Sequence, residues 1–388
     1  MLLAALSGPL HQAPEAFDPF ASRWAEVATG PGPLAGPLFA SLVNTVAGFD
    51  PVGWGVPYGT ALATDAPQLL LEVAAQALAA LLDHGAPGPH NHHHGAQDEG
   101  EAPPPNVFRR LLGEIRDPKA MTTIYRGLTR LLNNVHEAES TYLPGSAYKV
   151  MCHQEILVLV WKLVEENDAF CQHILKHCDI TRLVVPVLFL MYEARQQPAK
   201  VGLVHICTFL LLKLSGERAL GVLLNKPYQE RLPMVDLPIF QGTHADFLIV
   251  TLQKIIVTGT DKLSSLYHCF LTIVCNISPY CKTLSLVASV KLVNLFETFS
   301  SPRFFFSSET NHLFVALLLE IFNNIIQYQY AGNPHLVYAI VRRKQVFSRL
   351  THLELPMAVR NLSIPPGVTG TGGAAEADLD ASLATVEE

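Results

Sequence analysis

Residues 271–277 read LTIVCNI, and residues 319–325, which lie 48 positions further along the chain, read LEIFNNI. A second pair of similar phrases is VWKLVEE at 160–166 and LLKLSGE at 211–217, separated by 51 positions. These separations lie just above the roughly 40–47 residues of armadillo and HEAT repeats, which are small groups of helices. The two pairs therefore predict a chain built from repeated helix pairs with loops inserted between them.

The sequence around these phrases also favours helices over strands. Apolar phrases of roughly 10–16 residues are separated by short polar turns, and strand-like alternation is almost absent. Hydrophobic residues make up 49% of the 388 residues and charged residues only 16%, as expected if stacked repeats share a continuous core. We predict an all-α fold, an irregular α-solenoid of armadillo/HEAT-like helix pairs.

Changes in composition divide the chain into five parts. These are a poorly ordered Gly/Pro/Ala-rich start at 1–35, a helical segment at 36–83, a His/Pro-rich low-complexity linker at 84–106, the helical-repeat solenoid at 107–353 with an extended connector at 224–244, and a disordered acidic tail at 354–388.

The clearest helix in the N-terminal part is the phrase PQLLLEVAAQALAALLDHG at 67–85. Asp65 suits the N-cap, Pro67 suits the first turn, and Gly85 can close the C-terminus. The 3.6-residue period predicts one buried face, made of Leu70, Val73, Ala74, Ala77, Leu78 and Leu81.

Composition also argues against several classes of protein. The longest uncharged apolar runs, 183–192 and 201–212, are shorter than the roughly 18 residues of a membrane-spanning helix. A net charge of −7 argues against a general nucleic-acid binder. Seven cysteines without a CxxC pair indicate reduced thiols in the cytosol, and we expect Cys269, Cys275 and Cys281 to be buried small hydrophobes.

The connector contains the first set of candidate catalytic residues, which are Glu230, Asp236, His244 and Asp246. In an enzyme, His244 would act as a base or metal ligand and Asp246 would orient it.

The alternative for the same stretch is structural. Pro227, Pro233 and Pro238 keep the chain out of a helix. Gly242 then supplies a turn, and Thr243 or Asp246 caps a helix that begins near Ala245. We favour this second interpretation, because a single His–Asp pair does not provide the several convergent groups of an active site.

A second candidate is CQHILKHCD at 171–179, where His173 and His177 share a helix face and Cys178 and Asp179 follow. This spacing suits zinc, but the HExxH glutamate is missing and a further ligand would have to come from another helix. Two histidines at an exposed helix end are the favoured alternative. The tract HNHHHG at 90–95 can bind metal only weakly, and we expect no catalytic residue, metal or cofactor.

Arg342, Arg343 and Lys344, followed by Arg349, form a basic cluster. On an exposed helix end it would attract anionic lipid or an acidic partner. A solvated helix face is the favoured interpretation, because three adjacent charges are too few for stable membrane attachment.

Several long strings identify a family resemblance that covers most of residues 36–352. The strings are SLVNTVAGFDPVGWGVPY (41–58), LLKLSGERALGVLLNKPY (211–228), LPIFQGTHADFLIV (237–250), CFLTIVCNISPYCKTLS (269–285) and LLEIFNNIIQYQYAGNPHLVYAIVRRKQVF (318–347). In these strings the sequence resembles the high-temperature-induced dauer-formation proteins, which are Golgi-associated trafficking proteins.

The resemblance implies a non-enzymatic scaffold or adaptor at the cytosolic face of the Golgi and trans-Golgi network, acting in protein sorting and dense-core vesicle formation. It implies protein partners and peripheral membrane association, with no nucleic acid and no small-molecule substrate. Candidate interaction residues are Asn225, Lys226, Pro227 and Tyr228 in the family signature, and Arg342, Arg343 and Lys344.

Family members typically begin Met-Gly with a myristoylation site, whereas here Leu2 follows Met1. The chain therefore resembles a fragment of such a protein or a partial gene model. The alternatives are a cytosolic helical-repeat adaptor unrelated to membranes and a metal-dependent hydrolase that uses His173 with His177, or His244 with Asp246.

Overall fold

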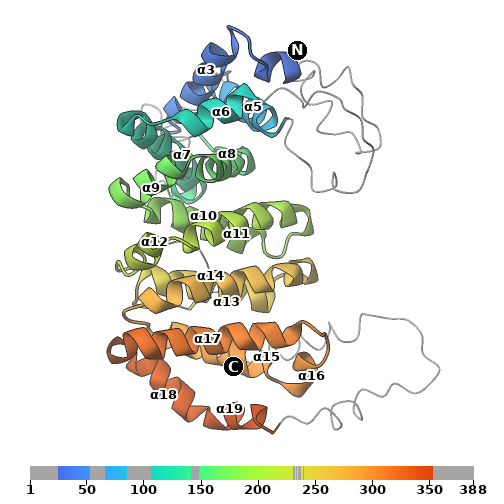
Figure 1. The fold of residues 1–388 in the computed structure, drawn as a ribbon, viewed down its shortest axis with the longest axis vertical. Helices are drawn as coiled ribbons and strands as arrows, with labels where there is room; N and C mark the ends of the chain where they lie inside the picture. The colour runs from blue at the N-terminus through green and yellow to red at the C-terminus, as the bar shows by residue number, and fades with distance from the viewer. Residues whose placement is uncertain are drawn as a thin grey trace, which may run out of the picture. The chain divides into compact units, whose positions relative to one another are not determined.

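A computed structural model describes most of the chain between residues 25 and 352 (Figure 1). The described residues are 25–52, 66–84, 106–140 (without the side chains of 137–140), 148–229, 232, 234, 237, 238 and 240–352. These residues form helices and no β-strand, and an isolated bridge pairs Pro227 with Thr243. The all-α prediction is confirmed. The tail 354–388, nearly all of the linker 84–106 and residues 1–24 lie outside the described part.

The chain divides into two compact units, Met1–Leu183 and Val184–Glu388. The boundary falls in the first turn of helix α10 (Thr181–Ala194).

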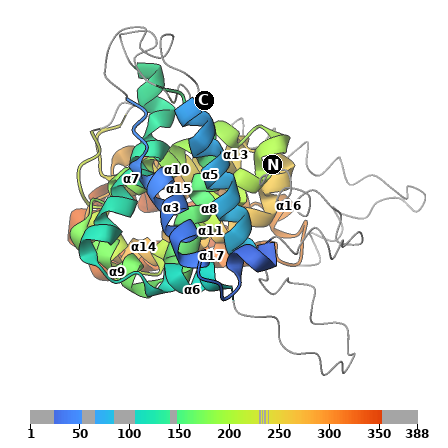
Figure 2. The same cartoon turned by 90° about the horizontal axis from the view of Figure 1, so that it is seen from above.

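The helices of the first unit pack around α3 and α8. They are α3 (Ala35–Gly48), α5 (Ala66–Asp83), α6 (Val107–Glu114), α7 (Pro118–Ser140), α8 (His153–Glu166) and α9 (Asp168–His177). Helix α3 contacts α5, α6 and α7, while α8 contacts α5, α6, α7 and α9. Figure 2 shows α3 lying between α5 and α7.

Helix α5 buries a broader face than the sequence period predicts. Leu70 is 58% exposed, so its assignment to the buried face is wrong, while Val73 is half-buried. Because α5 contacts both α3 and α8, a second row of residues is covered. The buried residues are Leu71, Ala74, Ala75, Ala77, Leu78, Leu81 and Leu82. The predicted caps Asp65 and Gly85 lie outside the described residues.

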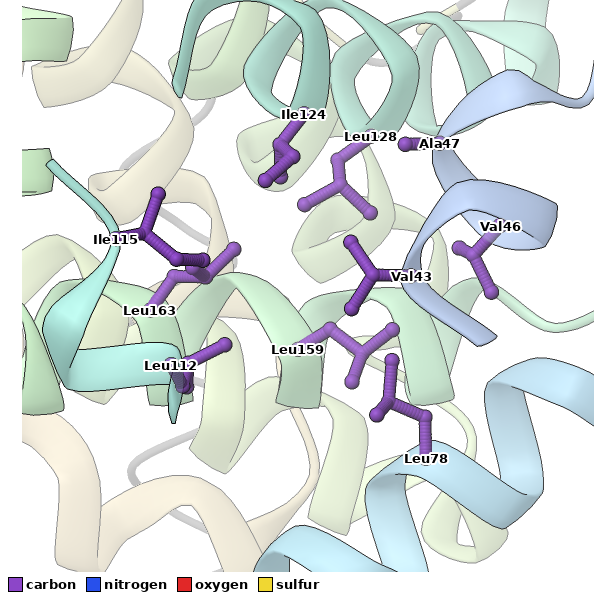
Figure 3. Close-up of a pocket in the computed structure, with 10 residues that line it drawn as sticks. All are labelled: Val43, Val46, Ala47, Leu78, Leu112, Ile115, Ile124, Leu128, Leu159 and Leu163. Carbon is purple, nitrogen blue, oxygen red and sulfur yellow. The ribbon is translucent and has the colours of Figure 1, made fainter. Parts of the chain in front are cut away.

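A small apolar cavity lies between helices of the first unit (Figure 3). Its volume of about 20 Å³ corresponds to roughly one water molecule, and an apolar wall favours an empty cavity. Side chains from five helices point into it: Val43, Val46, Ala47, Leu78, Leu112, Ile124, Leu128, Leu159 and Leu163, with Ile115 from the turn after α6. We interpret it as a packing defect, because it is too small for an organic ligand.

Helices α3 and α7 approach each other closely at Gly127. A Cβ atom at this position would lie 2.2 Å from the carbonyl oxygen of Ala47. Only glycine therefore permits the observed distance between the two backbones.

The contacts among the helices of the second unit define two rows. In one row α11 contacts α14 and α14 contacts α17; in the other, α13 contacts α15 and α15 contacts α18. Contacts of α13 with α14 and of α15 with α17 join the rows. The helices are α11 (Val201–Ser215), α12 (Arg218–Leu223), α13 (His244–Thr258), α14 (Tyr267–Ile277), α15 (Leu286–Phe299), α16 (Pro302–Phe305), α17 (Asn311–Gln329), α18 (Pro334–Arg342) and α19 (Lys344–Leu350), with short 3₁₀ segments η2 (Pro198–Lys200), η3 (Asp261–Leu266), η4 (Ser278–Tyr280) and η5 (Tyr330–Gly332).

Helix α13 is buried from His244 to Ile256 without interruption. A helix that is covered on all sides tolerates apolar residues at every position. Apolar residues accordingly fill the centre of HADFLIVTLQKIIVT, and five polar residues are buried with them: His244, Asp246, Thr251, Gln253 and Lys254. Such burial accounts for part of the high hydrophobic content of the chain.

Two helical stretches, Ala66–Asp83 and Pro198–Ser215, are long and apolar enough to cross a membrane by length and composition. In each, 39% of the window is buried, and α5 and α11 pack against neighbouring helices of their own unit. Core helices meet the same criterion, so the absence of a spanning segment stays a prediction.

Candidate binding groove and connector

The connector between α12 and α13 is fixed at both of its ends. Next to the Pro227–Thr243 bridge, the Tyr228 N–H donates to the Gly242 carbonyl at 2.9 Å. The Tyr228 ring stacks on Phe247 of α13, with 4.5 Å between ring centroids, and on Phe240, with 5.8 Å between centroids. Tyr228 is therefore a packing residue that holds the two connector ends against α13.

Thr243 caps α13 as predicted. Its hydroxyl accepts a hydrogen bond from the Asp246 N–H, while Asp246 Oδ2 accepts from the Thr243 N–H at 2.7 Å. This reciprocal pair is a capping box, which satisfies two of the free N–H groups at a helix start. Gly242 precedes it, and a Cβ there would meet Asp246 Oδ2 at 2.5 Å.

The structure contradicts the hypothesis that Asp246 orients His244. The two carboxylate oxygens of Asp246 accept hydrogen bonds from Thr243 and, at 2.7 Å, from the Ser285 N–H. His244 Nδ1 lies 2.9 Å from the carbonyl oxygen of Lys226. Both side chains thus hold backbone segments together. Glu230 and Asp236 lie outside the described residues.

His173 and His177 lie side by side on α9, with 5.0 Å between their ring centroids. His173 Nε2 is 2.8 Å from the Thr122 hydroxyl of α7, and partial burial together with His177 lowers the pKa of His173. Among the described residues, no group of three or more His, Cys, Asp or Glu side chains could hold a metal ion. The tract at 90–95 lies outside them.

All seven cysteines are free thiols. Cys275 and Cys281 are buried as expected, but the expectation is wrong for Cys269, which is partly exposed. Cys269 and Cys275 are six positions apart on α14. Six positions turn a helix through more than one and a half turns, so the two cysteines do not share a face.

The basic cluster is spread over the junction of α18 and α19. Arg342, Lys344 and Arg349 are exposed. Arg343, however, forms an ion pair with Glu297 of α15. The charge of Arg343 is therefore partly balanced within the protein, which weakens the cluster as a site for anions.

Asn225 joins α12 to η4 instead of presenting a free amide. Its Nδ2 donates to the Tyr280 carbonyl at 2.9 Å and to the Gly221 carbonyl at 3.1 Å, and its Oδ1 accepts from the Lys282 N–H at 2.9 Å. Its immediate neighbours Lys226 and Pro227 are exposed.

A polar groove of about 610 Å³ opens beside these contacts, entirely within the second unit. Sequence reasoning did not identify it, although LTIVCNI and LEIFNNI place Asn276 and Asn324 at equivalent positions. Residues of α12, α14, η4 and α17 line it: Arg218, Cys275, Asn276, Pro279, Tyr280, Glu320, Asn324, Tyr328 and Gln329.

Three amide side chains in the groove each donate a hydrogen bond from their side-chain nitrogen to another group of the protein. Asn276 Nδ2 donates to the Ser215 hydroxyl at 3.0 Å, and Asn324 Nδ2 donates to the Ser278 hydroxyl at 3.1 Å. Gln329 Nε2 donates to the Pro279 carbonyl at 2.8 Å. Their side-chain oxygens accept no hydrogen bond from the described part of the chain, so each amide offers an oriented acceptor to a ligand.

The described residues thus define an all-helical protein with a polar groove. The chain belongs to the family described as high-temperature-induced dauer-formation protein, which matches residues 1–364. The recognition made from the quoted strings is confirmed.

Curated relatives show the same relationship. The chain is 48% identical to "Protein HID1" of Homo sapiens over 324 residues, which are 82% of this chain and 41% of the relative. It is 33% identical to "Protein HID1" of Dictyostelium discoideum over 371 residues (91% and 41%). Identity to the "Ubp5-interacting protein ftp105" of Schizosaccharomyces pombe is 28% over 357 residues (88% and 38%). The matched region spans about two fifths of these relatives, and no solved structure matches the chain.

Proposed function

We propose that the chain is part of a non-enzymatic scaffold or adaptor that acts in protein sorting and dense-core vesicle formation at the Golgi and trans-Golgi network. Membership of the family over residues 1–364 carries this proposal. The names of the three relatives designate no catalytic activity, which supports a non-enzymatic role.

The two helix rows of the second unit support a repeat architecture. Alternate helices occupy alternate rows, α11–α14–α17 and α13–α15–α18, as in stacked helix pairs. We propose that these pairs are units of an irregular α-solenoid. Such stacks present long surfaces suited to protein partners.

A protein-binding role also agrees with the name of one relative, the Schizosaccharomyces pombe protein described as Ubp5-interacting. We propose that the partners lie at the cytosolic face of the Golgi and that membrane association is peripheral. A single myristoyl chain gives only marginal binding, so a relative that carries one needs a second contact.

Imaging in secretory cells tests this function. The tagged chain is compared with a version extended at its N-terminus by a Met-Gly myristoylation sequence, and with the same extension carrying alanine in place of that glycine. We expect the lipidated version to concentrate at trans-Golgi markers, with the other two mainly diffuse but retaining residual Golgi signal. A fully diffuse distribution of all three would overturn the Golgi assignment and favour a cytosolic adaptor unrelated to membranes.

A further inference from the structure

We propose that the polar groove of the second unit binds an extended segment of a partner protein and recognises its backbone through Asn276, Asn324 and Gln329. This deepens the proposed adaptor function and rests on it, because it names the surface and the kind of partner that the surface takes.

The chemistry of the groove matches a peptide backbone. A peptide presents N–H donors and C=O acceptors, and the carboxamides of Asn and Gln present the same two kinds of group. Because Ser215, Ser278 and the Pro279 carbonyl already hold the three amides, little side-chain entropy is lost when a ligand binds.

The charges of the groove argue against other ligands. Among the described residues that line the groove, Arg218 and Glu320 are the charged ones, and they have opposite signs. A site for phosphate or nucleic acid would need an excess of cations. An amphipathic helix would need a continuous apolar groove, whereas polar side chains form most of this lining.

The spacing of the amides suits an extended chain. Asn276 lies on α14 and Asn324 lies on α17, which are packed neighbours. Packed helices are about 8–10 Å apart, and an extended chain advances about 3.3 Å per residue. Because backbone groups on one side of an extended chain recur at every second residue, the two amides face ligand residues about two to four positions apart, and inclusion of Arg218 on α12 extends the site to about six residues.

Two tyrosines line the groove: Tyr280 is packed in its wall, and Tyr328 is exposed at its rim. The Tyr280 ring packs over Gly221, where an added Cβ would lie 2.5 Å from the ring. Tyr328 is 58% exposed at the rim. Tyrosine is one of the residues enriched among those that carry most of the binding energy of interfaces.

Photo-crosslinking with synthetic peptides locates the site. The intact chain carries p-benzoylphenylalanine in place of Tyr328 or, as control, in place of Tyr338, which is 62% exposed and does not line the groove. Each protein is mixed with a random library of 12-residue peptides, and crosslinked peptides are identified by mass spectrometry. We expect capture at position 328 at least tenfold above position 338. Equal capture at both positions, or capture at neither, would overturn the proposal.

Binding of a captured peptide is then measured by fluorescence anisotropy. Asn324→Leu removes the amide but keeps the side-chain size, and Ser278 retains its bond to the Cys275 carbonyl at 2.7 Å, so the fold should persist. Asn323→Leu is the matched control, because Asn323 is exposed and does not line the groove. We expect at least tenfold weaker binding for Asn324→Leu and less than twofold for Asn323→Leu, with unchanged helicity by circular dichroism. Equal affinities for the two variants would disprove recognition by the amide.

Methylation of single backbone nitrogens in the peptide tests backbone recognition directly. We expect tenfold weaker binding when the methyl group is at either of two positions about two to four residues apart, and smaller effects of alanine substitution at most side chains. The opposite pattern would show that side chains are read instead. If no peptide binds while the lipidated chain still reaches the Golgi, the groove proposal alone fails; if peptides bind and Golgi targeting is absent, the proposed function alone fails.

Discussion

Asp246 joins the starts of two helices through Ser285. Asp246 Oδ1 accepts a hydrogen bond from the Ser285 N–H at 2.7 Å, while Oδ2 is held by Thr243 at the start of α13. The Ser285 hydroxyl in turn accepts from the Ala288 N–H and caps α15. Because Asp246 is only 1% exposed, these bonds replace its hydration.

Removal of the Asp246 carboxylate should destabilise the second unit. We expect Asp246→Ala to lower the free energy of unfolding by about 2–3 kcal/mol, because hydrogen bonds to a charged group are lost and buried N–H donors remain unpaired. The free energy of unfolding is measured by urea denaturation, with circular dichroism as the signal. The control is Asp261→Ala on the exposed first turn of η3, which should change stability by less than about 0.5 kcal/mol. A similar small change for both variants would show that the link is not structural.

Gly127→Ala should destabilise the first unit by about 1–3 kcal/mol, because α3 and α7 must separate to admit the methyl group. The matched control is Gly202→Ala in α11, where an added Cβ meets nothing within 4 Å. That change should stabilise the protein by about 0.5–1 kcal/mol through the higher helix propensity of alanine. Thermal unfolding compares the stabilities of the two variants. An unchanged stability of Gly127→Ala would contradict the close approach of α3 and α7 at this position.

Alkaline pH should destabilise the protein through its buried thiols. Burial, with the nearby Asp246 charge, raises the pKa of the Cys281 thiol to about 12 from an ordinary value of 9.0. Above pH 9.0 the unfolded chain loses a proton that the folded chain retains, so this stabilisation is full below pH 9.0 and is lost as pH rises towards about 12. We expect the urea midpoint to fall between pH 9.0 and about 11, with a shallower fall for Cys281→Ala. An identical pH slope for the variant would exclude Cys281 as a contributor.

Protein purified without an affinity tag should contain well below one zinc ion per chain. The Nε2 atom of His173 already forms a hydrogen bond with the Thr122 hydroxyl. Among the described residues, no further His, Cys, Asp or Glu side chain completes a metal site with His173 and His177. Elemental analysis checks this, with His173→Ala plus His177→Ala as the comparison. Stoichiometric zinc that disappears in the double variant would revive the metal hypothesis.

The purified chain should not float with liposomes of Golgi-like anionic lipid near physiological salt. A basic residue near such a surface contributes about 1 kcal/mol, and Arg343 is already paired with Glu297. The net charge of −7 opposes binding. Strong flotation that Arg342→Glu with Lys344→Glu abolishes, while Arg303→Glu does not, would show that the cluster binds membranes.

Local features of the fold follow from the sequence, and long-range pairings do not. The helices and the Thr243 cap were predictable because helical period and capping depend on neighbouring residues. The buried face of α5 was partly wrong because its second neighbour, α8, lies far along the chain. The Arg343–Glu297 pair and the groove require knowledge of which helices become neighbours. The equivalent positions of Asn276 and Asn324 were the one available signal for the groove.

The asparagine bonds between helices of the second unit have a consequence for synthesis of the chain. Asn225 bonds to Tyr280 and Asn324 bonds to Ser278, partners that are 55 and 46 positions apart. Each bond can form once the later of its two partners has left the ribosome, without waiting for the C-terminus. Because domains fold progressively during translation and short-range contacts form fastest, the second unit can assemble co-translationally, and each completed layer provides the surface on which the next one folds.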